Sequence, residues 1–172
     1  FATFPCRIIN SGDVMQDAAL FYRRIAAEKS GVIARLGLAG KAFALCTIHR
    51  SENTDVPERL EAIIAALDEI AGEMEVVLPL HPRTRKIMSA GGLDSHCTVI
   101  NPVGYFDMIQ LLEQTSIVLT DSGGLQKEAF FFSKPCITLR DETEWTELVD
   151  GGYNVLVGAD SSAIIQSFRN RI

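Results

Sequence analysis

The sequence lacks the long apolar segments that a membrane protein needs. Residues 63–67 form one of its apolar runs, which Asp68 and Glu69 end, whereas a membrane-spanning helix needs about 20 predominantly apolar residues. Residues 1–7 do not combine a charged segment with an apolar stretch, as a secretory signal would. We therefore expect no membrane partner and a cytoplasmic location.

Positive charge is also scarce. The 172 residues include 16 Lys and Arg against 22 Asp and Glu, which gives a net charge of −6. A dedicated nucleic-acid-binding protein normally carries a basic face, so we expect no nucleic-acid partner. The acidic balance still permits a local anion site built from backbone amides.

Cysteine is rare, and its spacing excludes the common metal sites. Cys6, Cys46, Cys97 and Cys136 form no CxxC or zinc-ligand pattern. Three of them lie in apolar, strand-like runs, so we expect buried free thiols and no metal. No GxSxG motif occurs either, which argues against a serine-triad hydrolase.

The remaining composition, 47% hydrophobic and 22% charged, is that of an ordinary globular protein. At this length we expect one domain with some additional chain. The sequence starts at Phe1 rather than Met, and residues 164–172 have a helical pattern that stops with the sequence. We therefore expect a fragment of a longer chain.

Apolar runs and turn signals alternate along most of the sequence. We expect strands at residues 42–48, 75–80, 97–100, 116–120, 136–139 and 154–157, and helices at 57–71, 84–90, 106–114, 125–133, 144–149 and 163–170. Continuous apolar strands separated by helices predict an α/β fold with a Rossmann-like, doubly wound, six-stranded parallel sheet.

The start of the chain has a different pattern. A helix is expected over residues 13–29, so we interpret residues 1–30 as an interdomain linker and residues 31–172 as the Rossmann-like domain. Asp55 and Glu58 around Pro57 predict a capping box at the start of the 57–71 helix.

The strand order 3-2-1-4-5-6, common in this fold class, locates a site between the first and fourth strands. The loops at their carboxyl ends are residues 49–53 and residues 121–124. His49 is the best acid–base candidate there, unless it only caps a strand end. Ser122, Gly123 and Gly124 precede a helix and form either a phosphate site or a plain turn.

Three other residues have both a functional and a structural interpretation. Glu128, further along that helix, could accept ribose hydroxyls or lie in solvent. His81 could contact an anion or form a structural turn, and Trp145 could line a pocket or fix a helix to the sheet. His96 is interpreted as a surface residue.

The segments TIHRSEN, LHPR, TDSGGLQKEA, KP and RDETE, and the earlier NSGDVM, resemble the non-hydrolysing UDP-N-acetylglucosamine 2-epimerases. The resemblance covers residues 8–158. It implies one half of a GT-B two-domain fold, the carboxyl-terminal UDP-binding domain, with the amino-terminal domain absent. It also implies a UDP-sugar substrate, a homodimer at full length and no metal or other cofactor.

The activity implied is conversion of UDP-N-acetylglucosamine to UDP-N-acetylmannosamine through UDP elimination to a glycal. The fragment alone is expected to be inactive. The family's catalytic histidine and glutamate match His49 and Glu52, and its UDP contacts match Ser122, Gly123, Gly124 and Glu128. Its contacts to an allosteric UDP-sugar match Arg50 and His81.

Departures from the family pattern bear on the substrate. Trp145 stands where many members have an arginine that holds the nucleotide, and Met108 replaces an aromatic beside the uracil. Ser51 replaces the second arginine of a common pattern. These differences leave two alternatives, a 2-epimerase of another UDP-sugar such as a diacetamido uronic acid, or the nucleotide-binding domain of a GT-B glycosyltransferase.

Overall fold

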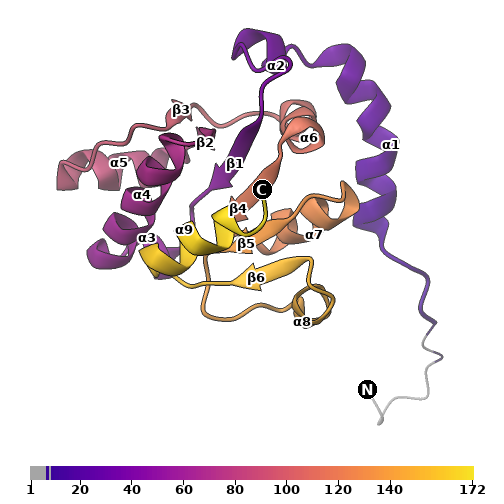
Figure 1. Ribbon diagram of the computed structural model, residues 1–172. Helices are drawn as coiled ribbons and strands as arrows, with labels where there is room; N and C mark the ends of the chain where they lie inside the picture. The colour runs from indigo at the N-terminus through magenta and orange to yellow at the C-terminus, as the bar shows by residue number, and fades with distance from the viewer. Residues whose placement is uncertain (1–6, 8) are drawn as a thin grey trace.

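The structure is built on a six-stranded parallel sheet. The computed structural model describes residue 7 and residues 9–172 (Figure 1). Its strands are β1 (Phe43–Thr47), β2 (Glu75–Pro79), β3 (Thr98–Ile100), β4 (Ile117–Thr120), β5 (Cys136–Thr138) and β6 (Asn154–Leu156). They pair in parallel in the order β3-β2-β1-β4-β5-β6. The predicted fold class and strand order are both confirmed.

Helices precede the first strand, connect successive strands and follow the last one. They are α1 (Val14–Lys29), α2 (Val32–Arg35), α3 (Ser51–Thr54), α4 (Pro57–Ala71), α5 (Pro82–Gly91), α6 (Tyr105–Gln114), α7 (Gly123–Phe131), α8 (Thr146–Asp150) and α9 (Ser161–Arg169). The short α2 and α3 were not predicted. Helices α5 and α7 begin two residues earlier than expected, because His81 and Ser122 cap them through their side chains.

The predicted capping box at the start of α4 is wrong. Val56 is the N-cap and makes no side-chain capping bond. Asp55 instead ends α3 and forms an ion pair with Arg83. The unexpected helix α3 therefore takes the residue that the pattern had assigned as the cap.

Each face of the sheet packs on its own apolar core. Alternate residues of β1 point to opposite faces, so that Ala44 and Cys46 join one core cluster while Phe43 and Leu45 join the other. Burial on both faces explains why the strands are continuous apolar runs.

The thiols lie in this core. Cys46, Cys97 and Cys136 are free and buried, as predicted, and Cys6 lies outside the described residues. Burial raises the pKa of the Cys136 thiol to about 12, so it is an unreactive core group.

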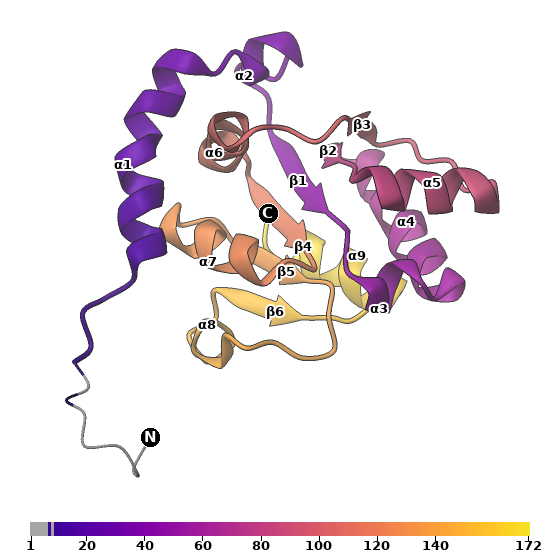
Figure 2. The ribbon, with the colours of Figure 1, turned by 180° about the vertical axis from the view of Figure 1, so that it is seen from behind.

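The predicted helix at the start of the chain is α1. It runs along the outside of the domain and packs against α6 and α7 (Figure 2). Among the described residues, no helix is both long and apolar enough to cross a membrane.

Candidate functional site

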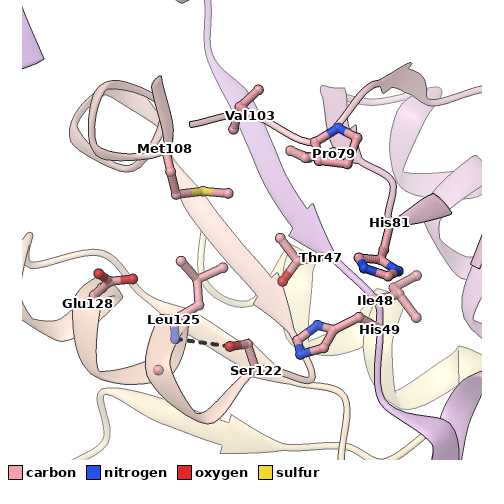
Figure 3. Close-up of a pocket in the computed structure, with 12 residues that line it drawn as sticks. Thr47, Ile48, His49, Pro79, His81, Val103, Met108, Ser122, Leu125 and Glu128 are labelled. Carbon is pink, nitrogen blue, oxygen red and sulfur yellow. Dashed lines mark hydrogen bonds between the residues drawn. The ribbon is translucent and has the colours of Figure 1, made fainter. Parts of the chain in front are cut away.

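A cavity of about 300 Å³ opens at the carboxyl ends of the central strands. It lies where the strand order reverses, between β1 and β4, the position at which doubly wound sheets bind ligands. Its lining comes from Thr47, Ile48, His49, Pro79, His81, Pro102, Val103, Met108, Ser122, Gly124, Leu125 and Glu128 (Figure 3). Five predicted site residues and Gly124 of the expected phosphate loop therefore share one cavity.

Asp121 organises one end of this cavity. Its carboxylate is fully buried and accepts hydrogen bonds from the backbone N–H groups of His49, at 3.0 and 3.1 Å, and of Arg50, at 2.9 Å. The Nδ1 atom of His49 lies 3.1 Å from Asp121 Oδ1. Asp121 was not among the predicted site residues, although its position directly after a central buried strand is a signal that the sequence contains.

The His49–Asp121 pair tunes both groups. Hydrogen bonding to the Asp121 carboxylate raises the pKa of His49 above its ordinary value, although partial burial opposes this. Burial raises the pKa of Asp121, but hydrogen bonds from His49 and Arg50 outweigh it and leave the pKa below its ordinary value. With Nδ1 on the carboxylate, the Nε2 atom of His49 remains available for proton transfer.

The first turn of α7 forms the floor of the cavity. Ser122 Oγ accepts a hydrogen bond from Leu125 N at 3.3 Å, and Ser122 N donates to Thr120 Oγ1 at 2.9 Å. These bonds fix a turn whose amide N–H groups and positive helix dipole suit an anion. Gly124 lines the cavity, whereas a side chain at Gly123 would collide with the Glu144 carboxylate.

Glu128 and Met108 lie at the other end of the cavity from His49 (Figure 3). Burial raises the pKa of Glu128 above its ordinary value, and the Tyr105 hydroxyl partly offsets this. The cavity thus has a carboxylate and an apolar wall at one end, a helix N-terminus in the middle and a histidine at the other. That arrangement suits a ligand with hydroxyl, diphosphate and reactive parts in a row.

Comparison with known sequences decides the family. The sequence model of the family described as UDP-N-acetylglucosamine 2-epimerase matches residues 3–172. The chain belongs to this family.

Individual relatives agree. The chain is 53% identical over its whole length to UDP-2,3-diacetamido-2,3-dideoxy-D-glucuronate 2-epimerase of Pseudomonas aeruginosa, of which it covers 48%. It is 41% identical to a UDP-N-acetylglucosamine 2-epimerase homolog of Methanococcus maripaludis, over 93% of this chain and 46% of the relative. The chain therefore spans about half the length of the curated relatives it matches.

A solved epimerase has the same fold. The crystal structure of Methanocaldococcus jannaschii UDP-GlcNAc 2-epimerase, in complex with UDP-GlcNAc and UDP, superimposes with a TM-score of 0.86 at 35% identity. The match covers 93% of this chain and 46% of that one. The six-stranded sheet of this epimerase-family chain corresponds to one half of a GT-B structure.

The structure places three predicted site residues outside this cavity: Glu52, Arg50 and Trp145. Among the described residues, the cavity lining includes none of the three. Glu52 lies on α3, and its carboxylate accepts a hydrogen bond from the buried Arg140 at 3.2 Å. Glu52 lies on the helical turn after His49, and strand-end position alone does not predict its contact with Arg140.

The other two donate hydrogen bonds to backbone carbonyls on either side of Ser122. Arg50 Nε donates to the Asp121 carbonyl at 3.0 Å, and Trp145 Nε1 donates to the Gly123 carbonyl at 2.9 Å. His81, in contrast, both lines the cavity and caps α5. His96 is exposed, as predicted.

Proposed function

We propose that this chain is the nucleotide-binding half of a UDP-sugar 2-epimerase, and that turnover requires a second, amino-terminal domain. The observation that carries the proposal is the cavity at the strand switch point, with the His49–Asp121 pair at one end and the first turn of α7 beside it. Membership of the 2-epimerase family supports the reaction type. The half-length match to relatives supports the need for a second domain.

For the substrate, we propose UDP-2,3-diacetamido-2,3-dideoxy-D-glucuronate rather than UDP-N-acetylglucosamine. The sequence motifs alone favour UDP-N-acetylglucosamine, with a diacetamido uronic acid as the alternative. The identity of 53% to the Pseudomonas aeruginosa enzyme, against 35% to the Methanocaldococcus jannaschii UDP-N-acetylglucosamine 2-epimerase, supports the alternative.

The proposed reaction is elimination followed by re-addition. A base removes the C2 proton, the C1–O bond breaks, and UDP departs with the bonding electrons to leave a glycal. Protonation of C2 on the other face and addition of UDP at C1 complete the inversion. The departing diphosphate gains negative charge, which the amides of the α7 first turn would stabilise.

The cavity residues suit the parts of this substrate. We assign the diphosphate to Ser122 and Gly124, the ribose to Glu128, and the base to the wall that includes Met108. His49 would exchange a proton near the sugar, held in one tautomer by Asp121. His81, close to this end, is assigned to an anionic group of the bound or activating UDP-sugar.

A solvent-isotope assay tests the reaction. The natural protein containing this chain would be incubated in D₂O with UDP-2,3-diacetamido-2,3-dideoxy-D-glucuronate, and in parallel with UDP-N-acetylglucosamine. We expect NMR to detect a C2 epimer carrying deuterium at C2, formed faster from the uronate. Neither epimer nor C2 deuterium with either sugar would contradict the proposal, and faster turnover of UDP-N-acetylglucosamine would contradict the substrate assignment alone.

Calorimetry tests the nucleotide site in the chain itself. UDP should bind saturably with EDTA present, and Ser122→Trp should abolish binding because the indole fills the cavity floor. Ser162→Trp, on an exposed position of α9, is the matched control and should bind UDP normally. Equal UDP binding by both variants would contradict the site.

A further inference from the structure

A chain of three side chains joins the segment before α1 to the proposed diphosphate site. Asp13 lies at the start of this chain. Its Oδ1 caps α1 by accepting a hydrogen bond from Met15 N at 2.9 Å, while its Oδ2 forms an ion pair with Lys127 on α7. One carboxylate therefore fixes both the beginning of α1 and a residue of the site helix.

Lys127 continues the chain to Trp145. Its Nζ lies 4.2 Å from the centroid of the Trp145 ring, within the range of a cation–π interaction. The Lys127 side chain is only 17% exposed, so the interaction is shielded from solvent. Lys127 is thus held between a carboxylate on one side and an aromatic face on the other.

Trp145 completes the chain at the site. Its indole N–H donates to the carbonyl of Gly123, the first residue of α7, at 2.9 Å. Its backbone N–H donates to Thr143 Oγ1 at 3.2 Å, and Thr143 in turn donates to the buried Gln126 at 2.7 Å. Trp145 therefore holds the first turn of α7 through the Gly123 carbonyl without being part of the cavity lining.

We propose that Lys127 and Trp145 are positioning residues that couple the segment around Asp13 to the diphosphate-binding turn of α7. This inference rests on the proposed function, because it assigns UDP to that turn. Anion binding by backbone amides requires the turn to be held within about 0.5 Å of its binding geometry. When Asp13 is displaced or uncharged, Lys127 loses its partner, Trp145 loses its cation, and the turn binds UDP less tightly.

The chain's composition provides a direct probe. Trp145 is the only tryptophan in the 172 residues, so tryptophan emission, excited at a wavelength that the tyrosines do not absorb, reports on its ring alone. Because Trp145 is not part of the cavity lining among the described residues, a change in its emission on UDP addition would reflect movement of the α7 turn. Both apolar core clusters are formed by residues of this chain, so we expect it to fold without further chain in this measurement.

Matched substitutions separate the coupling from the helix cap. Asp13→Asn keeps an N-cap of equal quality but removes the charge, and Lys127→Met removes the cation while keeping the stem. We expect each to weaken UDP binding about threefold to tenfold, the range of one such interaction, and to change Trp145 emission without ligand. Lys127→Arg keeps the cation and should keep both the UDP affinity and the Trp145 emission of the unmodified chain. Asp17→Asn, at an exposed position of α1, should change neither.

The outcomes distinguish this inference from the proposed function. If the unmodified chain binds no UDP, the proposed function is wrong and this inference falls with it. If the unmodified chain binds UDP and all variants bind it equally, with unchanged emission, only the coupling is overturned. If Lys127→Met binds UDP less tightly, and Lys127→Arg keeps both the affinity and the melting temperature of the unmodified chain, positioning by Lys127 is supported.

Discussion

The imidazole Nδ1 of His49 lies 3.1 Å from Oδ1 of Asp121, whose side chain has 0% exposed surface. The two residues follow the two central strands, β1 and β4, at the point where the sheet reverses its order. Thr47 and Thr120, the last residues of these strands, share a 2.6 Å hydrogen bond between their hydroxyls. The pairing of the strands thus sets the histidine's position, and the carboxylate sets its tautomer.

Replacement of Asp121 by Asn should lower the pKa of His49. The carboxylate raises that pKa in the folded protein, and a neutral amide would remove the stabilisation of the imidazolium form. An NMR titration of the His49 ring protons in both forms measures the change, with the exposed His96 as the internal reference. An unchanged His49 titration in Asp121→Asn would contradict this account.

The same pair should stabilise the fold within a defined pH window. A raised histidine pKa gives stability that is complete below the ordinary value of 6.5 and disappears as pH rises through the raised pKa. A lowered carboxylate pKa gives stability that is present above 3.8 and disappears as pH falls through the lowered pKa. Denaturant unfolding across pH should therefore show the largest difference in free energy of unfolding between the wild type and Asp121→Asn between pH 3.8 and pH 6.5.

The sequence predicted the framework of this site better than its contacts. The parallel sheet is predicted by the alternation of apolar strands with helices, and the 57–71 helix is predicted by the spacing of its apolar residues. Both are patterns that can be seen locally in the sequence, and both are confirmed. Strand-end position also predicted that His49 and Ser122 would meet at one cavity. The directions of Glu52 and Trp145 depend on a short helix and on Arg140 and Gly123, which are distant in sequence. Such contacts leave no periodic signal in a single sequence.

Asn53 should be important for stability although it lies outside the cavity lining. It is fully buried, and its Nδ2 donates to the Leu139 carbonyl at 2.8 Å and to Asp121 Oδ2 at 3.3 Å. Asn53→Ala would leave these acceptors without that donor, which costs about 1–3 kcal/mol. Denaturant unfolding measures the loss, and the exposed Asn101→Ala should change stability by less than about 0.5 kcal/mol. Equal effects of the two substitutions would refute the prediction.

Replacement of Ser133 by glycine should stabilise the fold. It has a positive φ of 55°, just after α7, where its N–H donates to Phe130 O at 2.9 Å and Lys134 N donates to Ala129 O at 2.8 Å. This is a Schellman motif, whose left-handed position favours glycine. Ser133→Gly should raise the free energy of unfolding by about 0.5–1 kcal/mol. Ser162→Gly, in the first turn of α9, should lower it, and a loss in both would contradict the argument.

Glu128 should trade stability for binding. Burial raises its pKa above the ordinary 4.5, so the ionised form is disfavoured in the folded protein. The resulting penalty develops as pH rises through 4.5 and is complete above the raised pKa. Above the raised pKa the unliganded protein therefore carries a carboxylate that costs stability.

Glu128→Gln removes that charge and keeps the shape of the side chain. The unliganded variant should melt at the same temperature or higher at neutral pH, whereas its UDP affinity should fall by at least about tenfold, since hydrogen bonds to a charged acceptor contribute about 1.5–3 kcal/mol. Calorimetric melting and UDP titration measure the two effects, with the exposed Glu147→Gln as control. If the Glu128 carboxylate only lay in solvent, the substitution would change neither the melting temperature nor the UDP affinity. Lower stability together with unchanged UDP affinity would show that Glu128 supports the fold rather than the ribose.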